Sequence, residues 1–108
     1  MIPLKFNLID KEISVEISDS IRDYYGLNGH CIIDKGLIQV QSNNPSLPPE
    51  EMELTFLHEL VHMILMTIGY TKISDDEQFV ELFARCFHQY KKTAIYPSAE
   101  NRKLITDD

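Results

Sequence analysis

Two histidines four residues apart, with a glutamate between them, are the residues of this chain whose types and spacing most clearly indicate chemistry. They form the string His58-Glu59-Leu60-Val61-His62, an H-E-x-x-H motif. Residues four apart on an α-helix lie on one face, so both imidazoles can reach a single metal ion. A carboxylate at Glu59 can then take a proton from a zinc-activated water. The motif predicts His58 and His62 as Zn²⁺ ligands and Glu59 as general base.

The residues around the motif predict a long helix that is buried on most sides. The stretch from Ser46 to Glu51 holds two prolines followed by two glutamates, which is typical of a helix start, and Gly69 is typical of its end. Apolar residues recur between them at helical spacing, at Leu54, Leu57, Val61, Ile64, Leu65 and Ile68. Because charged and polar residues stand at its centre, we expect a central helix of a globular domain and not a membrane span. The competing interpretation makes the motif residues ordinary core or surface side chains.

A catalytic zinc site has three protein ligands and one open position for water, so a third ligand is expected nearby. Glu77 lies fifteen residues after His62, which leaves room for a turn at Gly69 and the start of an antiparallel helix. Glu77 is therefore the expected third ligand. The alternative is a capping box, Ser74-x-x-Glu77, in which the Glu side chain bonds to the Ser74 amide.

Further polar residues on and before this second helix are candidates for supporting roles. Glu81 either ligates in place of the third ligand or accepts the spare N–H of a ligating histidine, and we expect the latter. Arg85 and His88 are candidates to contact substrate or an oxyanion. Tyr70, between the two helices, is the first candidate for the oxyanion donor, with His88 and Tyr90 behind it, although a tyrosine there is also a common packing residue.

These residues resemble the gluzincin branch of the zincin metallopeptidases, in which a Glu on the next helix completes H-E-x-x-H. The eight residues from Glu77, E-Q-F-V-E-L-F-A, resemble the E-x-x-A-N-x-F-A pattern of small ImmA/IrrE-like proteins of phages, prophages and bacterial mobile elements. Val80 and Glu81 replace the usual Ala-Asn. The resemblance covers residues 26–90, and it implies Glu77 as third ligand and Glu59 as general base. It also implies proteolysis of a specific protein partner such as a repressor-like regulator.

Length and composition predict one domain. The chain has 108 residues, of which 44% are apolar, enough for a core without disulfides. We expect a minimal domain over residues 1–92 and a partly disordered tail over 93–108, with no room for a DNA-binding or sensory domain. Cys31 and Cys86 lack metal-site spacing and are expected to be buried free thiols.

The net charge and the N-terminal residues indicate which partners and which cellular compartment to expect. The net charge of -7 argues against a nucleic-acid partner, because phosphate binding needs clustered Lys and Arg. The start of the chain alternates like a strand and does not resemble a signal segment. We expect a cytoplasmic protein of a bacterial or phage-infected cell, with no membrane partner. The sequence does not indicate the oligomeric state.

Before the motif helix the chain predicts strands. Apolar residues alternate over 2–8 and again over 13–17, which indicates a first hairpin, and residues 31–33 and 37–40 indicate a second, joined through Asp34-Lys35-Gly36. A short helix or turn is expected at 18–25, capped by Gly26. The expected fold is α+β: a small antiparallel sheet of two hairpins packed on the motif helix and a second ligand-bearing helix. Val40-Gln41-Ser42 is the expected edge strand, where a substrate can add as a further strand.

Two functions remain open at this point. In the first, the chain is a zinc metalloendopeptidase that hydrolyses a peptide bond in one intracellular protein partner. In the second, it is a catalytically weak or inactive zincin-like binding module that acts by contact with a phage or host protein. A structural zinc would need a fourth ligand, for which Glu81 and His88 are the candidates. The intact Glu59 favours the peptidase.

Overall fold

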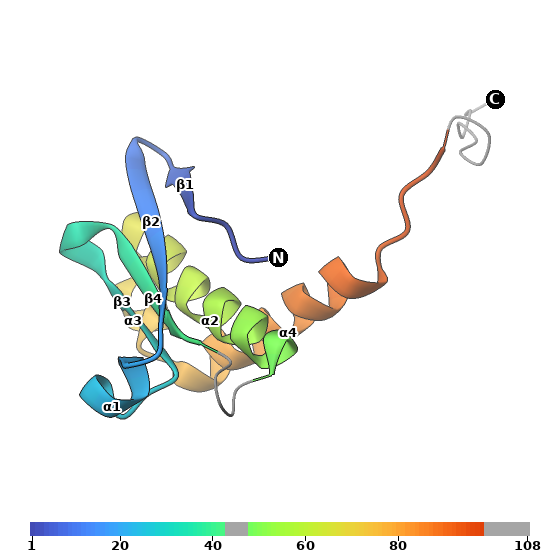
Figure 1. Cartoon of the computed structure of the whole chain (residues 1–108). Helices are drawn as coiled ribbons and strands as arrows, with labels where there is room; N and C mark the ends of the chain where they lie inside the picture. The colour runs from blue at the N-terminus through green and yellow to red at the C-terminus, as the bar shows by residue number, and fades with distance from the viewer. Residues whose placement is uncertain (43–47, 99–108) are drawn as a thin grey trace.

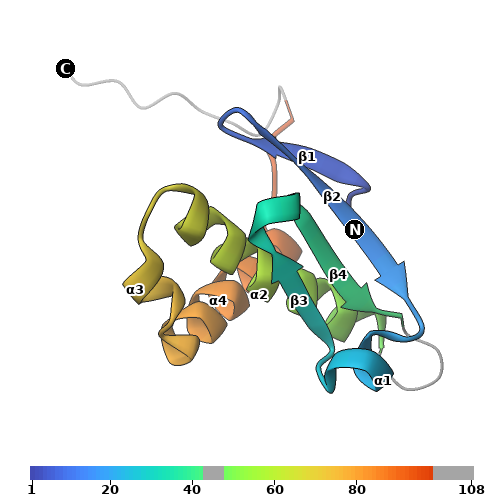
Figure 2. The same ribbon diagram turned by 90° about the vertical axis from the view of Figure 1, so that its left-hand side faces the viewer.

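The computed structural model describes residues 1–42 and 48–98 and has the predicted α+β class. In chain order the elements are β1 (Lys5–Leu8), β2 (Lys11–Ser18), α1 (Ile21–Tyr25), β3 (Gly29–Ile32), the 3-10 turn η1 (Ile33–Lys35), β4 (Leu37–Gln41), α2 (Pro49–Thr67), α3 (Thr71–Ser74) and α4 (Glu77–Thr93). Figures 1 and 2 show α2 between the sheet and α4. Within the described ranges, no helix is long and apolar enough to cross a membrane.

The sheet is mixed, which corrects the expectation of a purely antiparallel one. Both predicted hairpins are present, since β1 pairs antiparallel with β2 and β3 antiparallel with β4. They join through a parallel pairing of β2 with β4, which gives the strand order β1-β2-β4-β3. The chain between β2 and β4 passes through α1 and β3, and this connection lets β4 run in the same direction as β2.

The predicted edge strand at Val40-Gln41-Ser42 is wrong. Val40 and Gln41 belong to β4, which is hydrogen-bonded to β2 on one side and β3 on the other, and Ser42 donates its N–H to the Ser18 carbonyl. Val40 is fully buried, as an internal strand requires. Among the described strands, β3 pairs only with β4, so the edge on that side is β3.

α2 supplies much of the core. Its start at Pro49 and the positive φ of 88° at Gly69, just beyond its last residue Thr67, agree with the predicted boundaries. Ser46 and Leu47 of the predicted start lie outside the described residues. The buried side chains that α2 packs with the sheet and α4 are Ile13, Val15, Ile38, Val40, Met52, Leu54, Phe56, Leu57, Val61, Met63, Val80 and Ala84. This core fixes the direction in which the face carrying both histidines points.

The segment between α2 and α4 does not form the alternative capping box. Ser74 ends the short helix α3, and the residue that caps α4 is Asp76, whose carboxylate accepts the Phe79 N–H at 3.0 Å. α4 therefore begins at Glu77 without a Ser74–Glu77 bond pattern, and the Glu77 side chain is available for other contacts.

Candidate metal centre

The two histidines of the motif lie on α2 and turn the same ring atom toward the same point. The centres of the His58 and His62 rings are 5.0 Å apart, as expected for residues one helical turn apart. The Nε2 atom of each ring faces the carboxylate of Glu77, which stands at the start of α4. The expected pair of ligands is thus brought together by α2 alone.

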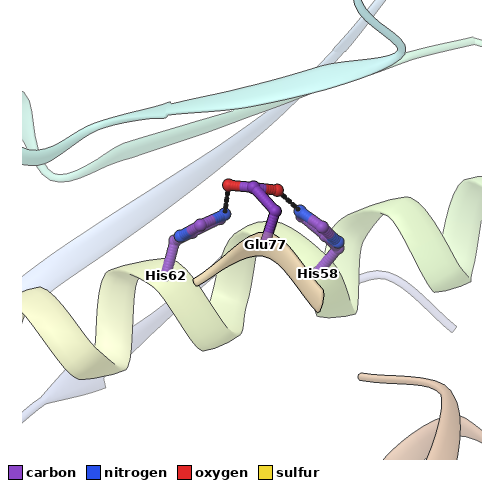
Figure 3. Close-up of side chains that lie close together, drawn as sticks. All are labelled: His58, His62 and Glu77. Carbon is purple, nitrogen blue, oxygen red and sulfur yellow. Dashed lines mark hydrogen bonds and ion pairs between the residues drawn. The ribbon is translucent and has the colours of Figure 1, made fainter. Parts of the chain in front are cut away.

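Glu77 completes the group and joins α4 to α2. One carboxylate oxygen lies 3.1 Å from His58 Nε2 and the other 2.9 Å from His62 Nε2 (Figure 3). One ligand atom from each of the three residues lies within 4.8 Å of the other two. An ionised carboxylate only accepts hydrogen bonds, so each nitrogen meets it through a proton or through a shared metal ion. We call His58, His62 and Glu77 the His/Glu cluster.

The outward nitrogens of both rings have hydrogen-bond partners. His58 Nδ1 donates to Glu81 Oε1 at 2.8 Å, and Arg85 Nε donates to the other Glu81 oxygen at 2.7 Å. Partial burial raises the pKa of Glu81, but the hydrogen bonds from His58 and Arg85 outweigh it and hold this pKa below its usual value. His62 Nδ1 lies 2.9 Å from Ser74 Oγ. The carboxylate partner requires a proton on Nδ1 of His58, which leaves the lone pair of the neutral ring on Nε2, and the Ser74 hydroxyl can accept an Nδ1–H from His62 in the same way.

Ser74 was not predicted for this role. Its spacing from Glu77 indicates only a helix cap, whereas in the structure it is buried against His62. Its position depends on the short helix α3, which turns the chain back after Gly69. The only signal for this role in the sequence is that a small, polar residue stands just before the helix expected to carry the third ligand.

Glu59 lies on the side of α2 that faces β3. It is buried at 8% exposure, and burial raises the pKa of its carboxyl, while His58 and His62 oppose this shift. The Cys31 thiol on β3 hydrogen-bonds to Glu59, and burial together with this neighbour raises the pKa of Cys31 to about 12. A carboxyl with a raised pKa beside a possible metal site suits a group that accepts and returns a proton.

Gly29 allows β3 to lie this close to α2. A Cβ at position 29 would stand 2.6 Å from Thr55 Cγ2 and 3.4 Å from Glu59 Cγ. The absence of a side chain therefore brings the β3 backbone next to the proposed base. No sequence pattern predicts this close approach, because the contact joins residues far apart along the chain.

A groove of about 280 Å³ adjoins the cluster. Its lining includes residues 27–29 before and within β3, Thr55, His58 and Glu59 on α2, and Glu81 and Arg85 on α4. Of the residues expected to contact substrate, Arg85 therefore lies beside the His/Glu cluster.

The other candidates lie elsewhere. His88 faces Glu53, with Nε2 3.9 Å from a carboxylate oxygen, and it lines a separate pocket with Leu54. Tyr90 is exposed, and its hydroxyl lies 3.4 Å from that of Tyr96. Tyr70 immediately precedes α3 and is more than half exposed, so its role as oxyanion donor stays a prediction.

The two cysteines differ in their exposure to solvent. Both thiols are free, but only Cys31 is partly buried, and Cys86 is exposed on α4, contrary to the expectation that both are buried. Exposure at Cys86 follows from the side of α4 on which it lies, opposite Val80 and Ala84.

Comparison of the chain with protein-family models, with curated proteins and with solved structures found no match. The geometry of the cluster therefore carries the functional argument.

Proposed function

We propose that the chain is a zinc metallopeptidase that cleaves a peptide bond in a specific protein partner. The observation that carries this proposal is the convergence of His58 Nε2, His62 Nε2 and the Glu77 carboxylate beside the buried Glu59. Two imidazoles and one carboxylate are a donor set that suits a catalytic zinc with an open position.

The surrounding hydrogen bonds fit this donor set. Glu81 accepts the Nδ1–H of His58 and Ser74 contacts Nδ1 of His62, so both rings are oriented for ligation through Nε2. A bound zinc ion supplies a Lewis acid that lowers the pKa of water and polarises the scissile carbonyl. Glu59 takes the proton from the attacking water and passes it to the leaving amine nitrogen.

The edge of β3 provides a place for an extended substrate. Gln41 donates its N–H to the Asn28 carbonyl at 2.7 Å, and the same register places His30 opposite Gln39. In an antiparallel pair the main-chain groups alternate in direction, so those of Gly29 and Cys31 point to the edge away from β4. A substrate strand that adds there runs beside Glu59 and gains main-chain hydrogen bonds.

The class of substrate is an intracellular protein or peptide, and the resemblance to ImmA/IrrE-like proteins favours a repressor-like regulator in a bacterial or phage-infected cytoplasm. Tyr70 is our candidate for the oxyanion donor. The competing function is a zincin-like module that binds such a partner without cutting it.

The first experiment measures zinc per chain after dialysis in wild type, Glu77→Ala and Glu59→Gln, with Asp75→Ala as a matched control beside the cluster. We expect one equivalent in wild type, Glu59→Gln and Asp75→Ala, and loss in Glu77→Ala. Zinc that is retained in Glu77→Ala rejects Glu77 as a ligand. A folded wild type without zinc rejects the metal centre altogether.

The second experiment separates cleavage from binding. Partners are captured from cell extract on the Glu59→Gln protein, identified by mass spectrometry and then incubated with zinc-loaded wild type. We expect one captured protein to be cut by wild type and left intact by Glu59→Gln. If captured partners bind both forms equally and stay uncut, the binding module is the correct function.

A further inference from the structure

The face of α4 opposite the His/Glu cluster is apolar and about half exposed, and at its C-terminal end the Tyr90 hydroxyl lies 3.4 Å from that of Tyr96. Val80 and Ala84, on the inner face, are fully buried. On the outer face five large apolar side chains are between 41% and 55% exposed, namely Phe79, Leu82, Phe83, Phe87 and Tyr90. Cys86 is exposed on the same face. We call these six residues the outer stripe.

The aromatic rings of the outer stripe form two contacting pairs along α4. The ring centres of Phe79 and Phe83 are 5.9 Å apart, and those of Phe87 and Tyr90 are 6.0 Å apart. At roughly 200 Å² for each large side chain, the exposed fractions correspond to about 500 Å² of apolar surface. Apolar patches of this size on a single chain commonly mark an interaction site.

The area and the spacing fit a second copy of the same chain. Two such stripes in contact bury about 1,000 Å², which is near the lower bound for a specific interface. The stripe is also symmetric about the middle of α4: in an antiparallel pair Phe79 lies opposite Tyr90, Leu82 opposite Phe87, and Phe83 opposite the small Cys86. A two-fold interface requires a surface that is complementary to itself in this way.

The antiparallel arrangement has two further physical consequences. It places the dipoles of the two α4 helices in opposite directions, which is favourable. It also leaves the inner face of α4 free for Glu77 and Glu81, because these side chains contact α2 and point away from the stripe.

We propose that the outer stripe is a homodimer interface in which α4 packs antiparallel against α4 of a second copy. Each apolar side chain of the stripe contributes to the contact twice, once from each copy. The dimer does not depend on metal at the His/Glu cluster.

The test compares the mass in solution of wild type with that of Phe83→Glu and of Tyr24→Glu. Tyr24 on α1 is more exposed than any of the five large apolar side chains of the stripe, so its substitution is the matched control. By analytical ultracentrifugation we expect wild type and Tyr24→Glu to have twice the 12.5 kDa mass of the chain. Phe83→Glu should raise the dimer dissociation constant by more than about tenfold, because two carboxylates are buried near the two-fold axis. Circular dichroism verifies that the variants fold.

A second measurement locates the interface. Cys86 of each copy lies near the two-fold axis, so a short bismaleimide should join two chains in wild type and Cys31→Ser but not in Cys86→Ser or Phe83→Glu. A wild type that stays at the mass of one chain over its accessible concentration range overturns the proposal, and another protein or segment then covers the stripe. A dimer that Phe83→Glu leaves intact, with no link through Cys86, also overturns it.

Discussion

α2 and α4 both contribute residues to the His/Glu cluster, but they are held in the fold in different ways. α2 buries seven of its side chains between the sheet and α4, whereas α4 buries only Val80 and Ala84. The histidines therefore stand on a helix fixed by the core. Glu77 stands on a helix that is buried along one face only, and its position depends on the packing of that face and on the hydrogen bonds that α4 makes to α2.

The largest effect on the free energy of unfolding is expected from a substitution that leaves a cavity beneath α2. Leu57 is almost completely buried, so Leu57→Ala removes core contacts and leaves a void that the surrounding side chains fill only in part. We expect the free energy of unfolding to fall by about 2–5 kcal/mol, measured by urea denaturation. A loss below about 1 kcal/mol would show that α2 is not the fixed element of the pair.

A smaller effect is expected from overpacking the contact between the two helices. Ala84 is fully buried where α4 meets α2, so Ala84→Leu forces the helices apart at a cost of about 1–3 kcal/mol. Zinc affinity should fall as well, because Glu77 and Glu81 move away from His58. Gln89→Leu adds the same side chain at an exposed site on α4 and should leave zinc affinity unchanged. Equal zinc affinity in both variants would show that the contact at Ala84 does not position Glu77.

The next prediction concerns the hydrogen bond between α3 and α2. Ser74→Ala removes the hydroxyl that lies 2.9 Å from His62 Nδ1, so the ring loses its outer partner. We expect zinc affinity to fall by about tenfold, measured by competition with a chelator of known affinity. Thr71→Ala, at the exposed start of the same helix, should have the wild-type value. A wild-type value in Ser74→Ala as well would mean that Ser74 is a packing residue.

Much of the fold and the grouping of the cluster could be predicted because their signals are local. Helical periodicity predicts α2 and α4, and a four-residue separation predicts that His58 and His62 meet. Alternation predicts both hairpins. The need for a third zinc ligand, together with the length of the connection, singled out Glu77.

The parts that were missed depend on contacts between distant residues. The parallel pairing of β2 with β4 has no local signal, since apolar alternation is the same in either direction. The close approach of Gly29 to Thr55 follows from that sheet, and so does the contact of Cys31 with Glu59. The exposure of the aromatic face of α4 was also hidden, because periodicity shows that a face is apolar and not whether anything covers it.

The smallest effect on stability is expected on that exposed face. Leu82 is 55% exposed, so Leu82→Ala removes the same atoms as Leu57→Ala without leaving a cavity, and Ala is at least as favourable in a helix. At protein concentrations where the chain is a monomer, the free energy of unfolding should change by less than about 0.5 kcal/mol. A loss comparable to that of Leu57→Ala would mean that the outer stripe is covered within a single chain. The difference between the losses of unfolding free energy in Leu57→Ala and Leu82→Ala thus measures how much more strongly core packing holds α2 than it holds the outer face of α4.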